Sequence, residues 1–235
     1  MFRDFGGSSF LKPMILDRLE IINEEFYAET VEPPVLDILL AEAWRHFGTH
    51  FFRYNFGIYE SEIRRVLPLR IRLADFKLSK SQRRILRRNA HLVTTIKPSE
   101  ITAETHDLFD RHKRRFKSGV PNSIYDFLSR DPANHPTNGL DVSIRRNGKL
   151  LATSFFDVGK ISVSSIYAIF DPEETTSSLG IFTMLKEIEF AVENGKSLYY
   201  HGYAYEGESY YDYKKRFSGL EQFDWEGEWP PITRI

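Results

Sequence analysis

Cysteine is absent from this 235-residue sequence, and that absence excludes several kinds of chemistry. Without thiols the chain has no disulfides, no thiolate nucleophile and no cysteine ligands for zinc or an iron–sulfur cluster. Long apolar runs are also absent, since no stretch reaches the ~18 residues of a membrane-spanning helix. The first 20 residues include Asp4 and Asp17 and lack an unbroken apolar core, unlike a signal peptide. We therefore expect a cytoplasmic protein without a membrane partner.

The chain also has little net charge, −1 in total, but its charges are unevenly placed. Residues 1–62 hold 5 basic and 11 acidic residues, and residues 118–235 hold 11 and 17. Between them, residues 64–117 hold 16 basic residues and only 5 acidic ones. Such a block favours a polyanionic partner such as nucleic acid. The alternative is a solvated basic segment that pairs with the acidic flanks.

The centre of the basic block predicts a strand followed by a helix. Apolar residues alternate with Arg70 and Arg72, which indicates a half-exposed strand with arginines on its polar face. Ser79 and Gln82 form a capping-box pattern that begins a helix over residues 80–89.

This helix is expected to carry a one-sided basic face. At 100° per residue its cations fall within an arc of about 140°. No acids at i,i+4 spacing are present to pair with them. We therefore expect the strand and helix arginines to form one continuous phosphate-binding surface. The helix cations are Lys80, Arg83, Arg84, Arg87 and Arg88.

The rest of the pattern alternates helices and strands. It predicts helices near 14–26, over 32–48 (ending at Gly48), over 99–119, over 122–130, from the loop at 175–180 to Gly195, and over 210–217; strands over 49–56, 91–98, 161–173 and 196–205; and a hairpin around Asn147-Gly148. This order is that of the GNAT acyltransferase fold, an α/β layer with a mixed central sheet. We expect a small α+β region over 1–95 and a GNAT-like catalytic domain over 96–235.

The loop "TTSSLG" opens the helix that ends at Gly195. In this fold the corresponding loop receives an anionic acyl donor. Serine and glycine at a helix N-terminus offer free backbone N–H groups and the positive end of the helix dipole. Ser177, Ser178 and Gly180 are therefore candidate contacts to the donor. Plain helix capping is the alternative.

Five segments in sequence order resemble the arginyl/leucyl-tRNA–protein transferase family. They are "GTHFFRYN", "LPLRI" with "SQRRILRRN", "SIYAIFDPEETTSSLG", "HGYAYEG" and "YDYKKRF", within about residues 35–220. The resemblance implies an enzyme that moves an amino acid from aminoacyl-tRNA to the free α-amine of a protein or peptide, tagging proteins for degradation. Many family members have a cysteine pair just before "PLRI", whereas this chain has Ile63 and Val66 there. We therefore expect no metal, cluster or other cofactor besides the tRNA co-substrate.

The implied reaction is aminolysis of an ester, in which a carboxylate or imidazole takes the proton of the amine. Asp171 in "FDPEE" is the leading candidate base, with a turn-forming Asp-Pro as the alternative. Glu173, His201 and Tyr205 are further catalytic candidates. The remaining histidines show no metal-ligand spacing and are interpreted as structural; they are His46, His50, His91, His106, His112 and His135.

The resemblance makes Arg70, Arg72 and the helix arginines the candidates to contact the tRNA backbone, and further contacts to tRNA are expected near the C-terminus. Tyr203, like Tyr205, is a candidate to stack on the terminal adenosine, with sheet packing as the alternative. Lys214 and Arg216 are candidates to hold acceptor-stem phosphates, with a solvated surface as the alternative. We favour arginine over leucine as the transferred residue; an acidic pocket would suit arginine and an apolar one leucine.

Two other functions remain open from the sequence. An acyl-CoA-dependent N-acyltransferase of the same fold would need a glycine-rich donor loop, whereas "EETTSSLG" has one glycine. A non-catalytic RNA-binding module on the same fold is the other alternative.

Overall fold

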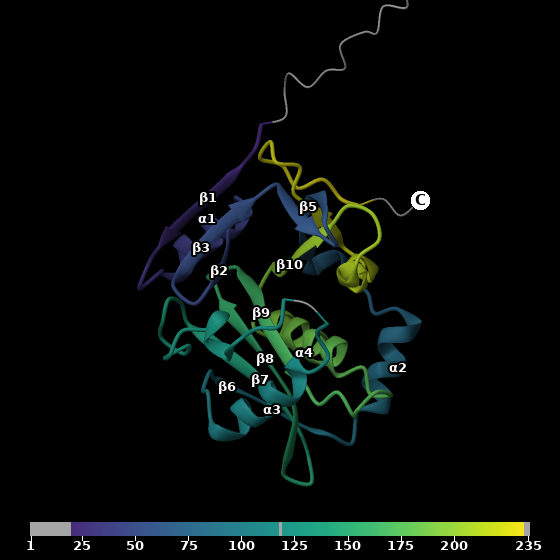
Figure 1. The fold of residues 1–235 in the computed structure, drawn as a ribbon. Helices are drawn as coiled ribbons and strands as arrows, with labels where there is room; N and C mark the ends of the chain where they lie inside the picture. Colours follow the sequence, from purple (N-terminus) through teal and green to yellow (C-terminus); the bar gives the residue numbers. More distant parts are fainter. Residues whose placement is uncertain (1–19, 118, 233–235) are drawn as a thin grey trace, which may run out of the picture.

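The computed structural model describes residues 20–117 and 119–232, which form one large and one small β-sheet with helices around them (Figure 1). The large sheet has eight strands in the order β11-β5-β10-β9-β8-β7-β6, with β4 paired to β5. Its strands are β4 (Phe56–Tyr59), β5 (Glu62–Arg72), β6 (Val93–Pro98), β7 (Gly139–Arg146), β8 (Lys149–Val158), β9 (Ser162–Phe170), β10 (Leu198–Tyr205) and β11 (Leu220–Gln222).

The large sheet is mixed, because β9 and β10 run parallel and the other neighbours antiparallel. This arrangement confirms the expected GNAT-like α/β class. Strands β5 and β6 share the sheet with strands formed by residues 139–222. The division of the chain at residue 95 stays a prediction. Within the described ranges, no helix is long and apolar enough to cross a membrane.

The small sheet consists of β1 (Asn23–Tyr27), β3 (His50–Tyr54) and β2 (Arg45–Phe47), in that order. Two N-terminal predictions are corrected here. Of the helix expected near 14–26, residues up to 19 lie outside the described residues. The remaining residues include the start of strand β1 and form no helix. The helix expected over 32–48 is α1 (Pro33–Ala41); Ala43, with φ 64°, follows it in a left-handed conformation that ends the helical path, and β2 begins at Arg45.

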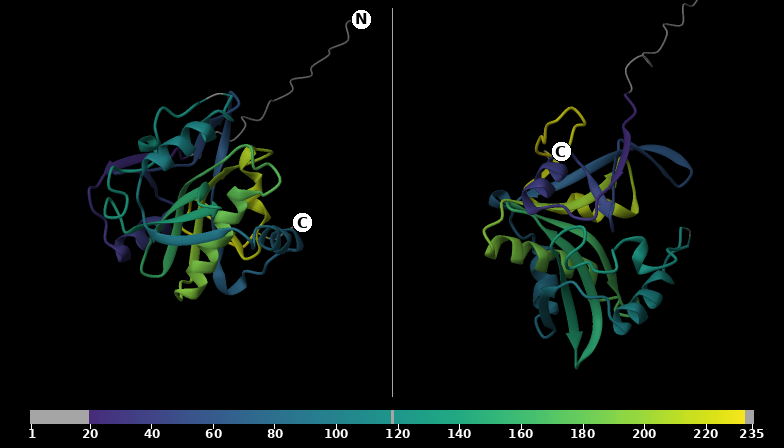
Figure 2. Two further views of the ribbon diagram at one scale, coloured as in Figure 1. Left: turned by 90° about the horizontal axis from the view of Figure 1, so that it is seen from below. Right: turned by 90° about the vertical axis from the view of Figure 1, so that its left-hand side faces the viewer.

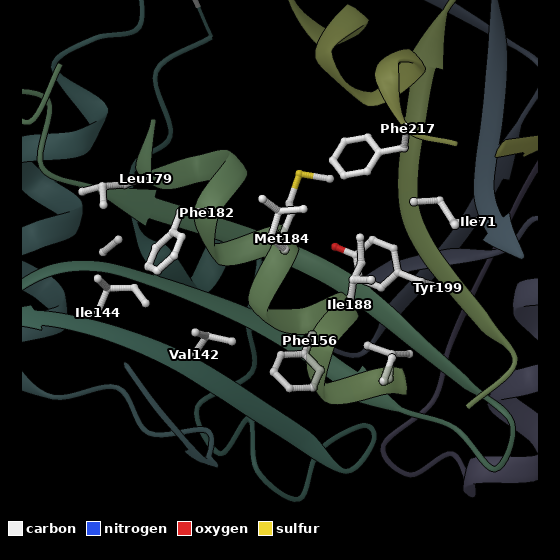
Figure 3. Packing of buried hydrophobic residues seen from close by; sticks show 14 of the residues in the cluster. Ile71, Val142, Ile144, Phe156, Leu179, Phe182, Met184, Ile188, Tyr199 and Phe217 are labelled. Carbon is white, nitrogen blue, oxygen red and sulfur yellow. The ribbon is translucent and has the colours of Figure 1, made fainter. Parts of the chain in front are cut away.

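Helices cover both faces of the large sheet (Figure 2). One face carries α4 (Leu179–Glu193) and α2 (Lys80–Arg88), whose apolar residues pack with those of the sheet in the main core (Figure 3). The other face carries α3 (Ala103–Lys113) and, beside it, α1 with the small sheet. Neighbouring residues of β10 illustrate the two sides: Tyr199 belongs to the α4 core and Tyr200 to the α1 core.

Local signals correctly placed the start of α2 and the turn between β7 and β8. Ser79 and Gln82 form the expected reciprocal capping box of α2, and Asn147-Gly148, both with positive φ, turn the expected β7–β8 hairpin. The helix expected over 99–119 is shorter, because Thr102 caps α3 and the helix ends at Lys113. The short helices expected over 122–130 and 210–217 are the 3-10 helices η2 (Ile124–Asp126) and η3 (Tyr210–Arg216).

The two parallel strands separate partway along their length. β9 and β10 pair from Leu198/Ser162 to Tyr200/Ser164, and both strands then continue without pairing to each other. β10 instead keeps its pairing with β5, with a register irregularity between Tyr200 and Gly202. A gap therefore opens between β9 and β10 in the middle of the sheet.

Candidate active site between strands β9 and β10

Two cations from distant parts of the chain meet in the gap. The Arg45 guanidinium, from β2, donates to Ser164 Oγ at 2.6 Å and also to the Ser165 carbonyl oxygen. Lys214 Nζ, from η3, donates to the Tyr203 carbonyl oxygen at 2.9 Å. Gly202 lies between them.

Gly202 makes room for both cations. A Cβ at this position would lie 3.1 Å from Lys214 Nζ and 3.6 Å from Arg45 Nη2. Its φ of +87° also belongs to the region that side chains rarely adopt. Position 202 therefore requires glycine for its backbone conformation and for the approach of the two cations.

Three ionisable groups beside the gap have shifted pKa values. Burial, followed by the charge of Arg45, lowers the pKa of Lys214 to about 7. Glu187 of α4 is fully buried and accepts a hydrogen bond from the Tyr199 hydroxyl at 2.7 Å; burial raises its pKa to about 7. Burial also lowers the pKa of His201 to about 3, so its imidazole is neutral. The gap thus holds an amine and a carboxyl group that both titrate near neutral pH.

The neutral ring of His201 is held by the backbone of η3. Nε2 donates to the Lys214 carbonyl oxygen at 3.1 Å, and Nδ1 has no hydrogen-bond partner within the described part of the chain. The ring stacks on Tyr199 with 5.9 Å between ring centroids. These contacts fix the bulged part of β10 next to Lys214.

A series of ring contacts, joined at one point by a hydrogen bond between the hydroxyls of Tyr54 and Tyr205, passes from β10 to β9 around the gap. On the β10 side, Tyr203 contacts Phe52 and Tyr54 edge-on, and Tyr205 contacts Tyr59 and Tyr211. Gly57 brings Tyr54 and Tyr205 together, since a Cβ there would meet both rings within 3.3 Å.

Arg115, near the end of α3, continues the series to β9. Its guanidinium lies 5.2 Å from the Tyr210 ring centroid and 4.7 Å from that of Phe170. From Phe170 the contacts return to the small sheet, ring by ring. We call this closed series the aromatic rim; its members are Phe47, Phe52, Tyr54, Tyr59, His112, Phe127, Tyr167, Phe170, Tyr203, Tyr205, Tyr210 and Tyr211, with Arg115 as the bridge.

The rim and the cations together suit a ligand with flat and anionic parts. Aromatic faces stack on nucleobases with little regard to sequence. The two cations at Gly202 attract a negative group. Within the described ranges no group of His, Asp or Glu side chains gathers as a metal site.

The predicted base Asp171 lies at the end of β9, outside the gap. Its buried carboxylate accepts hydrogen bonds from the Glu173 backbone at 3.1 Å, from Lys149 Nζ at 3.1 Å and from Arg111. Burial alone would raise its pKa, but these partners hold the pKa of Asp171 below its usual value. The contacts favour the structural Asp-Pro turn over a proton acceptor. Glu173 is exposed, whereas His201 and Tyr205 belong to the gap and its rim.

The loop at residues 175–180, expected to contact the donor, lies beside the basic helix α2 (Figure 1). Arg88 donates to the Thr176 carbonyl oxygen, and Asn89 Nδ2 to that of Ser177 at 2.8 Å. Ser178, the residue before α4, adopts φ 52° and its hydroxyl makes no cap hydrogen bond. Gly180 packs against Phe170 of the aromatic rim. The structure thus brings the predicted loop next to the end of α2.

The strand arginines do not join the helix arginines in one surface, contrary to the expectation. Arg70 and Arg72 both pair with Glu221 of β11, which is 2% exposed, and Arg70 also lies over Trp229. They face the α1 side of the sheet, whereas α2 packs on the α4 side. The arginines of α2 are exposed, and none of the ion pairs in the described part of the chain involves them. Of the two C-terminal candidates, Lys214 lies in the gap and Arg216 is exposed.

Sequence reasoning missed Arg45, Glu187 and Arg115. Glu187 carried a usable signal, because it shares the apolar face of its helix with Met184 and Ile188. Arg45 carried none, since its position depends on how the small sheet sits against β9.

Known proteins similar to this chain include enzymes and one structure of matching fold. The family described as "Arginine-tRNA-protein transferase, C terminus" matches residues 104–224. An aspartate/glutamate leucyltransferase of Xanthomonas euvesicatoria pv. vesicatoria is 31% identical over 175 residues, covering 70% of this chain and 70% of that protein. One from Acinetobacter baumannii is 27% identical, covering 73% of this chain and 64% of its own length. The solved structure of FemX has a TM-score of 0.50 at 13% identity, covering 85% of this chain and 69% of that one, which shows the fold alone.

Proposed function

Because this chain belongs to the arginine-tRNA–protein transferase family, we propose that it transfers an aminoacyl group from charged tRNA to the α-amine of a protein or peptide. The observation that carries the proposal is the gap between β9 and β10, with Arg45 and Lys214 inside it and the aromatic rim around it. Both β-strands of the gap contribute rings to the rim, so a bound substrate would contact both.

In the proposed reaction the neutral amine of the acceptor attacks the carbonyl carbon of the aminoacyl ester. A C–N bond forms, the C–O bond to the terminal ribose breaks, and the proton of the amine ends on the ribose hydroxyl. The ester is reactive, so holding the two substrates in place supplies much of the rate. Among the predicted catalytic residues, His201 and Tyr205 lie nearest to this chemistry.

The donor tRNA would bind along the outer face of α2 and the loop before α4. Arg84 and Arg87 are exposed there and make no ion pair in the described part of the chain. Such arginines suit phosphate contacts that depend on salt and carry little sequence information. Tyr203 donates its hydroxyl to the Ala43 carbonyl oxygen at 2.6 Å, which fixes its ring for stacking on the terminal adenosine.

We propose leucine rather than arginine as the transferred residue. The rim is aromatic, and the cations at and inside it include Arg64, Arg115, Lys214 and Arg45. The acid beside the gap, Glu187, is fully buried and bound to Tyr199. These surroundings suit an apolar side chain and disfavour a second guanidinium. The names of the relatives point the same way.

A transfer assay tests the proposal. Radiolabelled leucyl-tRNA and arginyl-tRNA are offered with peptides that begin with Asp, Glu, Arg or Lys, and acetyl-CoA serves as a parallel donor. Label from leucyl-tRNA on a peptide supports the whole proposal, and label from arginyl-tRNA alone corrects the donor. Transfer from acetyl-CoA alone would identify an acyl-CoA-dependent enzyme and contradict the proposal that tRNA is the donor.

A further inference from the structure

One buried side chain at the end of α2 binds the loop that precedes α4. Asn89, the residue that follows the helix, is 1% exposed. Its Nδ2 donates to the Ile85 carbonyl oxygen at 3.1 Å and to the Ser177 carbonyl oxygen at 2.8 Å. Both partners are acceptors, so the amide must present both of its hydrogens, and its orientation is fixed. Asn89 therefore joins the last turn of α2 to the donor loop, residues 175–180.

A second contact ties the same loop to α2. The Arg88 guanidinium donates to the Thr176 carbonyl oxygen, so two consecutive carbonyl groups of the donor loop accept hydrogen bonds from the end of α2. The backbone bond from Ser177 N to the Glu174 carbonyl oxygen, at 3.2 Å, shapes the turn of the loop. The contacts to α2 instead fix where this turn lies relative to the helix.

The donor loop has a conformation that needs such support. Ser178 has φ 52° and ψ 46°, a left-handed conformation that is unfavourable for a residue with a side chain and persists where its surroundings enforce it. Two residues further on, a Cβ at Gly180 would lie 3.1 Å from Cε1 of Phe170, a member of the aromatic rim. A shift of the loop would therefore also change its contact with the rim.

The helix that holds the loop is itself fixed. The capping box at its start and the packing of Ile85 and Leu86 on the main core determine its position. Its outer face presents Arg84 and Arg87, which are exposed and form no ion pair in the described part of the chain. At 1.5 Å per residue, Asn89 lies only about 3 Å beyond Arg87 along the axis. The cationic face and the support of the loop thus belong to one rigid element.

We propose that Asn89 is a positioning residue for transfer, which holds the donor loop at a set distance from tRNA phosphates bound on α2. This inference rests on the proposed function. Asn89 acts through the loop and contacts neither the reacting atoms nor a phosphate. Without its amide, tRNA should still bind to the arginines of α2. Transfer from the bound tRNA should become slower, because a misplacement of about 1 Å can cost up to a hundredfold in rate.

The test compares Asn89→Ala with Asn194→Ala. Asn194 ends α4 with the same bond, from Nδ2 to the Phe190 carbonyl oxygen four residues back at 2.8 Å, but it is exposed and far in sequence from the donor loop. Single-turnover transfer at saturating charged tRNA gives the rate, and filter binding of uncharged tRNA gives Kd. Asn89→Ala should lower the rate about tenfold or more and change Kd less than about threefold. Asn194→Ala should keep both values. An unchanged rate in Asn89→Ala, or a loss confined to Kd, would overturn the inference.

A second pair of variants serves if Asn89→Ala does not fold. Arg88 and Arg83 are both exposed, and each donates to a backbone carbonyl oxygen: Arg88 to Thr176 in the loop, and Arg83 to Leu78 before the helix. Arg88→Gln and Arg83→Gln each remove one charge, so tRNA affinity should fall by a similar factor. Arg88→Gln should slow transfer about threefold more than Arg83→Gln does. Equal transfer rates in these two variants would overturn the role of the loop contacts.

A measurement without transfer separates this inference from the proposed function. If the native protein moves no amino acid from any charged tRNA, the proposed function fails. Amide hydrogen exchange over residues 175–180 still tests the inference, because it needs only uncharged tRNA. Added tRNA should slow this exchange several-fold in the native protein and much less in Asn89→Ala. Equal slowing in the two proteins, or none in the native protein, would overturn the positioning role.

Discussion

Arg70 and Glu221, 151 positions apart in the chain, meet across β5 and β11 with 2.7 Å between Nε and Oε2. Arg72 binds the other carboxylate oxygen of Glu221. One buried carboxylate thus fixes two arginines that the charge pattern had assigned to nucleic acid. Their role follows from the partner that the fold supplies.

Arg70→Met is therefore expected to act on stability. Glu221 would stay buried with one cation in place of two, so the free energy of unfolding should fall by about 2–4 kcal/mol. Urea denaturation measures the loss. Arg53→Met is the control, because the Arg53–Glu24 pair is more exposed and should cost less than about 1 kcal/mol. A tRNA affinity that falls at unchanged stability would contradict this assignment.

The double change Arg84→Gln, Arg87→Gln is expected to act on tRNA binding. Both side chains are exposed, and the structure gives neither a hydrogen bond nor an ion pair in the described part of the chain. Unfolding should shift by less than about 0.5 kcal/mol. The slope of log K against log salt should become shallower by about two units, measured by filter binding. An unchanged slope would place the tRNA elsewhere.

These two cases show what the sequence predicts well. The Ser79–Gln82 capping box depends on neighbouring residues, and the sequence itself shows that α2 has no acids at pairing distance. The role of Arg70 could not be predicted, because its partner Glu221 lies in a strand at the far end of the chain. Similarly, the helix expected up to Gly48 stops at Ala41, since β2 gains its strand partner from β3.

The candidate site divides in the same way. Tyr203 and Lys214 could be chosen because their motifs resemble a family. Arg45 became visible only when β2 was placed against β9. Asp171 was selected for its motif. Its carboxylate is bound by the guanidinium of Arg111 from α3, a contact that the sequence does not reveal.

Glu187→Gln should change how stability depends on pH. The folded pKa of Glu187 is about 7, above the unfolded value near 4.5, so protonation stabilises the fold. This contribution is fully present below about pH 4.5 and is lost as pH rises through 7. The stability of the native protein relative to the Gln variant should thus fall by about 3 kcal/mol from pH 4.5 to 7.5, measured by urea denaturation. A difference that stays constant with pH would contradict the raised pKa.

Gly202→Ala should damage both fold and transfer. Its φ of +87° should cost about 1–3 kcal/mol for a residue with a side chain, and the methyl group would displace Lys214 Nζ. We expect kcat/KM for transfer to fall by about tenfold to a hundredfold. Gly148→Ala is the matched control: Gly148 has φ +81° with open space around it. It should lose stability and keep the transfer rate.

Asp171→Asn tests the base expected from the sequence. Because its carboxylate binds Arg111, Lys149 and the Glu173 backbone, we expect a loss of about 1–3 kcal/mol in stability. The value of kcat should stay within about threefold of native, since the group lies outside the gap. Single-turnover transfer from charged tRNA measures it. A fall of about a hundredfold or more at native stability would restore Asp171 as the proton acceptor.

The place of β5 between β10 and β11 has a consequence for the newly made chain. β4 pairs with the first part of β5, but β10 and β11 are synthesised more than a hundred residues after β5 ends at Arg72. At about 5–20 residues per second, β5 waits on the ribosome on the order of ten seconds for β10 and β11. Four arginines along it, Arg64, Arg65, Arg70 and Arg72, discourage pairing with other nascent chains during that time. Arg70 and Arg72, which bind Glu221 in the folded protein, thus also reduce aggregation of the incomplete sheet during synthesis.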